Sequence, residues 1–469
     1  MSVLDWVLVA VGLLAALGWT FARSHYQTAL TVVSICALLL AIATLAAEGQ
    51  QWQLVPWQAL GLLVAALVGL RRLRPGPARL WQRVTERGFL LIVVVVGAWA
   101  LLWVFVPSLP MPSGPYRLGT EVFHWTDASR HEPYGRTSEY RQVVAQAWYP
   151  TDATRGRSAP YFEEPGELPG MGGLPEFVFS GDFREAQTHA ILDAPASGAQ
   201  ATWPVLIFSP ALEVPREMYT GLCSEVASRG FVVLALSSTY ESAVTELANG
   251  EVVESAFPSD PSEEQLYELV KTRAADASFA LEQLDHLSGV APHSPLVGHL
   301  NLGEVGIFGH SIGGAATVQA LAENPRFRVG VNLNGSLWGS QPKERLTKPL
   351  LWVESGEGPG PKEKKTREEL LAGLQAGGAL ATITHSLHMS FSDEPSYMTS
   401  LGRTLWGNRA GMGRRSLATM ATLTADLVTA FAGPQLGVKG APSLSELATE
   451  HSAIELEREI KPASTASTP

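Results

Sequence analysis

Cysteine is almost absent from this sequence, with two among 469 residues. Cys36 lies in an apolar run and Cys223 in the later part of the chain, so we do not expect them to pair, and a disulfide framework is excluded. The sequence also has no H-E-x-x-H motif and no internal repeat of solenoid length. These absences argue against a zinc protease and against a repeat protein.

Basic side chains are sparse outside one segment. Lys and Arg total 34 against 45 Asp and Glu, which gives a formal net charge of −11. Residues 71–87 hold six of the arginines and one glutamate, so the rest of the chain is more acidic than the total suggests. An acidic surface repels phosphate backbones, and the remaining sequence has no basic stripe interleaved with aromatic residues. We therefore expect no nucleic-acid partner.

Apolar sequence, in contrast, is abundant near the N-terminus. The chain is 46% hydrophobic with a mean hydropathy of +0.09, which is high for a purely soluble protein. Four apolar runs each approach the ~20 residues that a helix needs to cross a bilayer, at 4–22, 29–47, 55–70 and 88–106. We predict a four-helix transmembrane region over residues 1–107. A cleaved signal peptide is the alternative for the first run, but residues 1–5 carry no basic side chain.

The placement of arginine predicts the orientation, because short loops rich in Lys and Arg stay cytoplasmic. The loop at 71–87 is the arginine-rich one, whereas the loop around 48–53 has no cation. With residues 71–87 inside, the N-terminus and everything after residue 106 lie outside. The sequence thus predicts a multi-pass membrane protein whose large domain is extracytoplasmic.

Residues 108–432 have the pattern of one large domain. After a proline-rich linker at 107–115, short β-branched runs alternate with longer helical patterns, which is typical of a mostly parallel, doubly wound α/β sheet. The predicted strands are 142–149, 204–209, 230–236, 304–308, 329–333, 349–353 and 381–384. Residues 433–469 are polar and are predicted to be a disordered tail, in which 444–460 has the composition of a single helix.

Residues 309–313 read Gly-His-Ser-Ile-Gly, a G-x-S-x-G motif between a predicted strand and a small-residue helix start. A turn in this context is strained, and its glycines leave room where side chains would collide, so that Ser311 is held exposed above the sheet. Ser311 is the candidate nucleophile. An oxyanion hole needs two backbone N–H groups, and their expected positions are Leu212 and Ile312.

A serine nucleophile needs a base, and a histidine after a late strand is where such a fold supplies it. His385 and His388 compete for this role. A metal pair is the alternative for the two histidines, but no cysteine or acidic third ligand stands at the usual spacing. We therefore expect no metal and no cofactor.

From residue 141 onward the chain resembles the platelet-activating factor acetylhydrolase family of the α/β-hydrolase fold, in its lipoprotein-associated and bacterial forms. The motifs that carry the resemblance are Ile-Phe-Ser-Pro-Ala-Leu at 207–212, Ala-Ser-Arg-Gly-Phe-Val-Val at 227–233, Gly-His-Ser-Ile-Gly at 309–313 and Ser-Leu-His-Met-Ser-Phe at 386–391. The resemblance implies an α/β-hydrolase fold with His388 as the base. It covers most of residues 116–432 and none of the membrane segments. One departure is Ala211, where family members usually carry glycine.

The second departure concerns the acid of the triad, because Asn334 stands where the family places an aspartate. An amide can accept a hydrogen bond from the histidine Nδ1–H, but it does not stabilise the imidazolium with a full charge. In chymotrypsin-type enzymes the change from aspartate to asparagine costs about 10⁴ in turnover. Two alternatives restore a carboxylate: Glu354 or Glu357 takes the acid role, or the Asn334-Gly335 pair deamidates.

The sequence therefore predicts a serine esterase that hydrolyses carboxylic esters, with activity reduced by Asn334. The resemblance implies a 1-alkyl-2-acetylglycerophosphocholine esterase that removes short acyl groups from phospholipids. The alternative is a catalytically impaired pseudo-hydrolase that binds a lipid or a partner at the membrane. A peptidase or polyesterase shares the same acyl-transfer chemistry and stays open.

Overall fold

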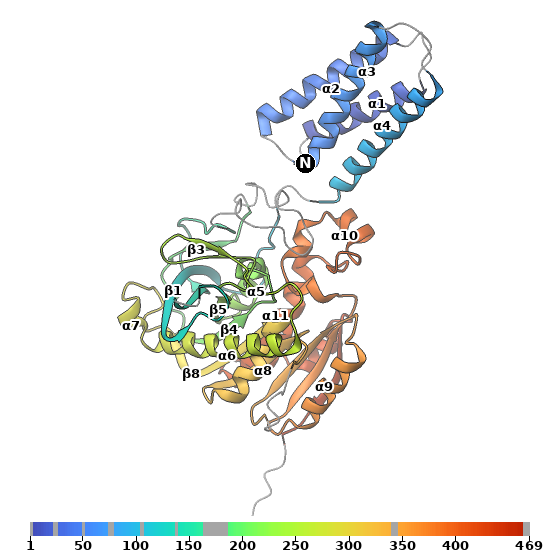
Figure 1. The fold of residues 1–469 in the computed structure, drawn as a ribbon. Coiled ribbons are helices and arrows are strands. Elements are labelled where there is room, and N and C mark those ends of the chain that lie inside the picture. Colours follow the sequence, from blue (N-terminus) through green and yellow to red (C-terminus); the bar gives the residue numbers. More distant parts are fainter. Residues whose placement is uncertain are drawn as a thin grey trace, which may run out of the picture. The chain divides into compact units, whose positions relative to one another are not determined.

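The computed structural model describes residues 3–21, 27–48, 52–73, 79–103, 107–136, 139–162, 186–338 and 346–462. The chain forms two compact units (Figure 1). The helical unit consists of Met1–Pro107 and Tyr397–Leu405, and the α/β unit consists of Ser108–Ser396 and Trp406–Pro469.

Four long helices make up most of the helical unit: α1 (Val3–Phe21), α2 (Gln27–Glu48), α3 (Val55–Leu73) and α4 (Leu80–Ala100). Leu60 and Val64 of α3 are fully buried between them. At Gly97 of α4 the helices approach so closely that a Cβ would lie 2.7 Å from the Trp57 ring. The exposed side chains of α1 and α2 are largely apolar, as expected of helices that face lipid.

Three stretches of the described residues are long and apolar enough to cross a membrane: Val3–Phe21, Thr28–Ala46 and Trp52–Leu73. The predicted fourth span at 88–106 is wrong as a candidate. The helix in this region, α4, begins at Leu80, and its first half carries Arg83, Glu86 and Arg87. An apolar run does not show where its helix begins, and here the helix includes a charged segment before the run.

The helical unit also takes in residues from late in the sequence. Thr399 donates two hydrogen bonds to the Leu102 carbonyl, from its backbone N–H at 2.9 Å and from its hydroxyl at 3.0 Å. Trp103 forms a β-bridge with Met398. A Cβ at Gly402, in the short helix α10 (Ser400–Trp406), would lie 2.2 Å from the Leu102 oxygen. The predicted boundaries placed residues 397–405 in the α/β domain at 108–432, whereas they belong to the helical unit.

A large sheet forms the centre of the α/β unit. Its ten strands among the described residues are β1 (Arg117–His131), β2 (Tyr140–Thr151), β3 (Ala190–Leu192), β4 (Trp203–Ser209), β5 (Val232–Ser237), β8 (Leu300–His310), β9 (Phe327–Leu333), β10 (Leu350–Ser355), β11 (Gly378–Ile383) and β12 (Ile454–Ile460). They are ordered β12-β11-β10-β9-β8-β4-β5-β2-β1-β3. A separate hairpin pairs β6 (Val244–Glu246) with β7 (Val252–Glu254).

Six neighbouring strands of the sheet run parallel: β5, β4, β8, β9, β10 and β11. On either side of them, β2 pairs antiparallel with β5 and β12 pairs antiparallel with β11. Each of the seven predicted strands overlaps one of these strands. The parallel strands end at one edge of the sheet, where β8 leads into Ser311 and β9 into Asn334. The topology therefore brings residues far apart in sequence to one edge.

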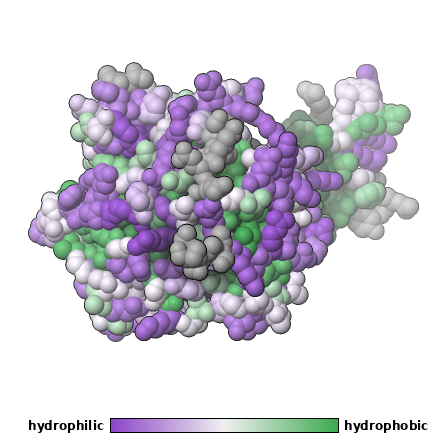
Figure 2. Space-filling model, turned by 90° about the horizontal axis from the view of Figure 1, so that it is seen from below, coloured by the Kyte–Doolittle hydropathy of each residue, from purple (hydrophilic) through white to green (hydrophobic). Residues whose placement is uncertain are grey.

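Helices cover both faces of the sheet: α5 (Thr220–Ala227), α6 (Glu263–Asp285), α7 (Leu287–Val290), α8 (Ile312–Glu323), α9 (Pro361–Ala372), α11 (Leu417–Gln435) and α12 (Leu444–Glu450). Val205 and Ile207 of β4 share a core cluster with residues of α6 and α8. The next residue, Phe208, points to the opposite face, where its ring centroid lies 4.8 Å from that of Tyr219. Hydrophilic side chains cover much of the face of this unit that Figure 2 shows.

The predicted disordered tail at 433–469 is wrong for most of its length. Residues 444–460 form α12 and then β12, rather than one helix. The strand pairs antiparallel with β11, from Gly378 opposite Ile460 to Ile383 opposite Ile454. The α/β unit therefore extends well beyond the predicted boundary at 432.

Candidate active site

Ser311 occupies a strained turn between β8 and α8. Its φ of 58° lies in the left-handed region, which non-glycine residues rarely adopt. A Cβ at Gly309 would lie 2.2 Å from the Gly313 oxygen, and a Cβ at Gly313 would lie 2.0 Å from the Ser209 oxygen. Both motif positions therefore require glycine, which is the geometry of a nucleophile elbow.

The backbone N–H groups of Leu212 and Ile312 have no hydrogen-bond partner among the described residues. The neighbouring Ala211 N–H is already bound, because it donates to the Tyr219 hydroxyl at 3.1 Å. The free pair is the one that the sequence predicts as an oxyanion hole. Such a hole needs unpaired donors aimed at the developing negative charge.

Buried groups that the sequence does not reveal hold the Leu212 loop in place. Arg273 of α6 donates from Nη1 to the Pro210 carbonyl at 2.6 Å. Its Nε donates to Glu241 at 2.9 Å, and Glu241 also accepts from Arg141 at 3.1 Å. All three charged side chains are buried. No local motif marks them, since they meet only after the sheet has formed.

His388 lies against Ser311, with its Nε2 2.9 Å from the serine Oγ. It begins the 3₁₀ turn η7 (His388–Phe391), which follows β11. The competing His385 is exposed. The Nδ1 of His388 is 2.6 Å from the Nδ2 of Asn334. The structure thus brings together Ser311, His388 and Asn334.

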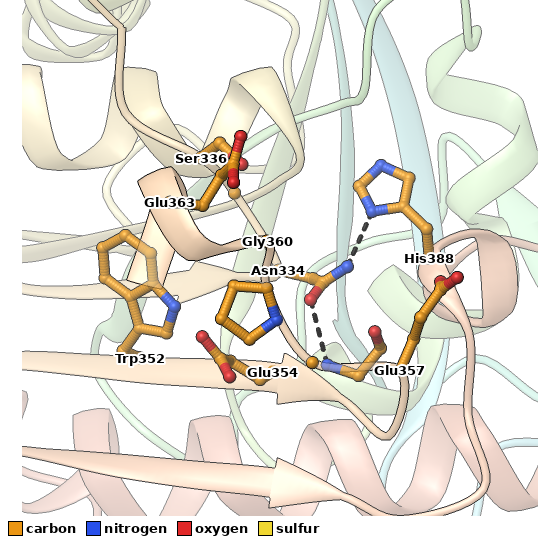
Figure 3. A pocket seen from close by; sticks show the side chains of 12 residues that line it. Asn334, Ser336, Trp352, Glu354, Glu357, Gly360, Glu363 and His388 are labelled. Carbon is orange, nitrogen blue, oxygen red and sulfur yellow. Dashed lines mark hydrogen bonds between the residues drawn. The ribbon is translucent and has the colours of Figure 1, made fainter. Parts of the chain in front are cut away.

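The Asn334 amide has an orientation opposite to the one expected from the sequence. Its Oδ1 accepts a hydrogen bond from the Ser355 N–H at 3.0 Å, so its amino group faces His388 (Figure 3). Asn334 follows β9 with φ 51°, and its own N–H donates to the Val353 carbonyl at 2.7 Å. Hydrogen bonds with the main chain of β10 therefore hold both the backbone N–H and the side-chain Oδ1 of Asn334.

The two glutamates proposed as replacement acids differ in their surroundings. Glu354 is buried and ion-paired with Arg367, and burial raises its pKa. Glu357 is exposed, and its charge raises the pKa of His388 without a hydrogen bond between the two among the described residues. Asn334, and neither glutamate, occupies the position next to the His388 Nδ1.

Burial controls the protonation of the histidines at the site. It lowers the pKa of His388, and the Glu357 charge opposes this only in part. His310 is fully buried beneath His388, with ring centroids 4.7 Å apart. Burial, and then the neighbouring His388, hold the pKa of His310 well below its usual value. His310 is therefore neutral, and its Nδ1 lies 2.7 Å from the Tyr219 hydroxyl.

Two kinds of surroundings adjoin the triad. A cavity of about 400 Å³ lies beside Asn334 and His388, and Trp352, Glu354 and Glu357 line it (Figure 3). In addition, Leu212 and Trp338 pack against an apolar cluster that includes Ile312. Among the residues that the structure describes, no three His, Cys, Asp or Glu side chains are grouped as a metal site would require.

The sheet order, the elbow and the Ser311 to His388 contact define an α/β-hydrolase. The ferulic acid esterase from Streptomyces cinnamoneus has a similar structure, with a TM-score of 0.64 and 27% identity over 75% of this chain and 99% of that one. Residues 173–412 match the family described as platelet-activating factor acetylhydrolase, isoform II, and the chain belongs to this family.

Two relatives illustrate how far the similarity extends. A probable 1-alkyl-2-acetylglycerophosphocholine esterase of Arthroderma benhamiae is 25% identical over 258 residues, which cover 50% of this chain and 61% of that protein. The platelet-activating factor acetylhydrolase of Cavia porcellus is 24% identical over 310 residues, or 61% of this chain and 69% of that protein. The match therefore leaves more than a third of the first relative uncovered.

Proposed function

We propose that this protein is a membrane-anchored serine esterase that hydrolyses carboxylic esters. The observation that carries the proposal is the 2.9 Å contact between Ser311 Oγ and His388 Nε2, beside the two free N–H groups of Leu212 and Ile312. These are the parts that acyl transfer through a serine requires.

In this mechanism Ser311 attacks the acyl carbon and His388 takes the serine proton. The N–H groups of Leu212 and Ile312 stabilise the negative oxygen of the tetrahedral intermediate. His388 returns the proton to the leaving alcohol, and an acyl-serine remains. Water, deprotonated by His388, then releases the carboxylic acid and restores Ser311.

The substrate class we propose is an ester with a short acyl group, on a phospholipid or a similar amphiphile. The names of the relatives support this choice, since they refer to acetyl esters of glycerophosphocholine and to platelet-activating factor. The apolar cluster around Leu212 and Trp338 supplies a surface for the apolar part of such a molecule. The competing function is a lipid-binding pseudo-hydrolase, which the orientation of the Asn334 amide favours.

The three candidate spans support a multi-pass anchor. An extracytoplasmic position of the α/β unit also belongs to the proposal, and the arginines at 71–87 support it. That position requires one further crossing after this loop, in addition to the three candidate spans. Digestion with an added protease in sealed vesicles of known orientation tests it, because only an α/β unit on the outer face of the vesicle is cut.

The test of the activity uses the full chain in detergent micelles with p-nitrophenyl acetate and a fluorophosphonate probe. We expect measurable turnover and labelling at Ser311, and loss of both in Ser311→Ala. Ser259→Ala, at an exposed serine, is the matched control and should behave as the unmodified protein. Turnover that survives Ser311→Ala would contradict the assignment, and absence of labelling would favour the binding function.

A further inference from the structure

The Asn334 amide cannot be turned over without breaking a contact with the main chain. Its Oδ1 accepts from the Ser355 N–H at 3.0 Å (Figure 3). A backbone N–H is always a donor, so the reverse orientation would place the amide NH₂ against another donor. The contact therefore fixes which end of the amide faces His388, and the end that faces Nδ1 is the amino group.

This orientation selects one tautomer of His388. Because Asn334 Nδ2 can only donate, Nδ1 of the neutral ring has to be the acceptor in the 2.6 Å contact. The single ring proton then resides on Nε2, which is 2.9 Å from Ser311 Oγ. A general base needs a lone pair at that nitrogen. In this tautomer His388 donates a hydrogen bond to Ser311 and is unable to take its proton.

We propose that Asn334 and the Ser355 N–H are positioning groups that hold His388 in the inactive tautomer, so that the site is an esterase kept at low turnover. The inference rests on the proposed function. An aspartate in the same place removes the restraint, because one oxygen accepts from the Ser355 N–H and the other from a His388 Nδ1–H. The proton then leaves Nε2, and the base faces the serine.

The first test compares the full chain with Asn334→Asp in detergent micelles. We expect kcat for p-nitrophenyl acetate to rise by about 10² to 10⁴, the upper figure being the cost of the reverse change in a serine protease. KM should change little, because the tautomer acts on the chemical step. Asn301→Asp is the matched control, since its Oδ1 also accepts a backbone N–H but lies away from the site. When the unmodified protein has measurable turnover, a kcat for Asn334→Asp that is no higher would overturn the inference.

The second test observes the tautomer directly and does not depend on activity. Nitrogen-15 spectra of histidine-labelled protein distinguish protonation at Nε2 from protonation at Nδ1, and His388→Gln identifies the signal. We expect the Nε2–H form in the unmodified protein and the Nδ1–H form in Asn334→Asp. An Nδ1–H signal in the unmodified protein refutes the inference. Absence of turnover and labelling in both proteins, with the expected spectra, contradicts the proposed function and leaves the tautomer assignment standing.

Deamidation at Asn334-Gly335 is separated from these outcomes by peptide mass spectrometry. The Gly335 N–H already donates to Asn332 Oδ1 at 2.7 Å. Turnover by the unmodified protein that increases in proportion to its deamidated fraction would agree with the inference, because the aspartate form is then the active one. Turnover as high in fully amidated protein as in Asn334→Asp would contradict it.

Discussion

The protonation of His388 depends on two opposing influences of its surroundings. Burial lowers its pKa, and the charge of Glu357 raises it. Three groups that contact its ring are uncharged at neutral pH: Ser311, Asn334 and His310. His388 is therefore neutral at pH 7, and protonation removes its ability to act as a base only below its ordinary pKa of 6.5.

We expect Glu357→Gln to move the acid limb of the pH profile to lower pH. The negative charge of the glutamate stabilises the imidazolium, so its removal lowers the pKa of His388. Turnover then persists to more acidic pH. The profile of kcat/KM between pH 4 and 8 measures the shift. Glu363→Gln, in the same cavity but without an influence on His388, is the control. An unmoved limb in Glu357→Gln would mean that the glutamate charge is screened by solvent.

Glu394 makes the stability of the α/β unit depend on pH. It is buried, and burial raises its pKa from 4.5 to about 8. The folded state therefore binds the proton more tightly than the unfolded chain does. The free energy of unfolding should fall as pH rises from about 4.5 to about 8, by at most ~1.4 kcal/mol per pH unit.

Glu394→Gln should make the thermal unfolding midpoint less dependent on pH in this range and raise it at pH 8, because the amide is neutral throughout. Tryptophan fluorescence during heating, at pH 5.5 and 8, measures the effect. Glu450→Gln, at an exposed position of α12, should leave the pH dependence unchanged. A midpoint for Glu394→Gln that follows the unmodified protein at both pH values would show that Glu394 is not the group responsible.

At the scale of elements, α6 positions the loop that carries Leu212. Arg273 donates hydrogen bonds to the Pro210 carbonyl and to Glu241, and both of these residues are buried. Arg273→Met should lower kcat by about 10- to 100-fold, less than the 10² to 10³ lost when an oxyanion donor itself is removed. KM should change little, because these donors act mainly on the transition state.

Rates normalised to the sites labelled by a fluorophosphonate separate this effect from poor folding. Arg273→Lys, which keeps one donor, should recover part of the loss. Arg326→Met is the control, because its ion pair with Asp285 is partly exposed and contributes little. Normalised rates equal to those of the unmodified protein would limit Arg273 to a role in stability.

The sequence predicted the buried parallel strands well but not the edge strands. Residues 454–460 read Ile-Glu-Leu-Glu-Arg-Glu-Ile. The alternation of apolar and charged residues fits an edge strand with one solvent-exposed face. We predicted a polar tail with one helix over 444–460, and the strand was missed because its pairing with β11 is not visible in a local pattern. The G-x-S-x-G motif predicted Ser311, whereas His388 and Asn334 were implied by the resemblance to the acetylhydrolase family. The direction of the Asn334 hydrogen bonds did not, since it depends on where β10 places the Ser355 N–H.

At the scale of the whole molecule, the chain enters the helical unit twice, first through residues 1–107 and again through 397–405. A protease site inserted at the exposed Met111 tests this arrangement. After cleavage in mild detergent the two fragments should still elute together, because Thr399 remains bound to Leu102. Gly402→Leu should release them, since its side chain would collide with the Leu102 carbonyl. Separation of the fragments without that substitution would contradict the division into units.

The contribution of residues 397–405 to the helical unit also sets an order of events during synthesis. Roughly 300 residues separate Trp103 from its bridge partner Met398, which at about 5–20 residues per second amounts to on the order of half a minute of translation. The N-terminal helices are thus synthesised long before the last segment of the helical unit exists. The helical unit is completed only after β8, Ser311 and His388 have been synthesised, so the two units reach their final form together.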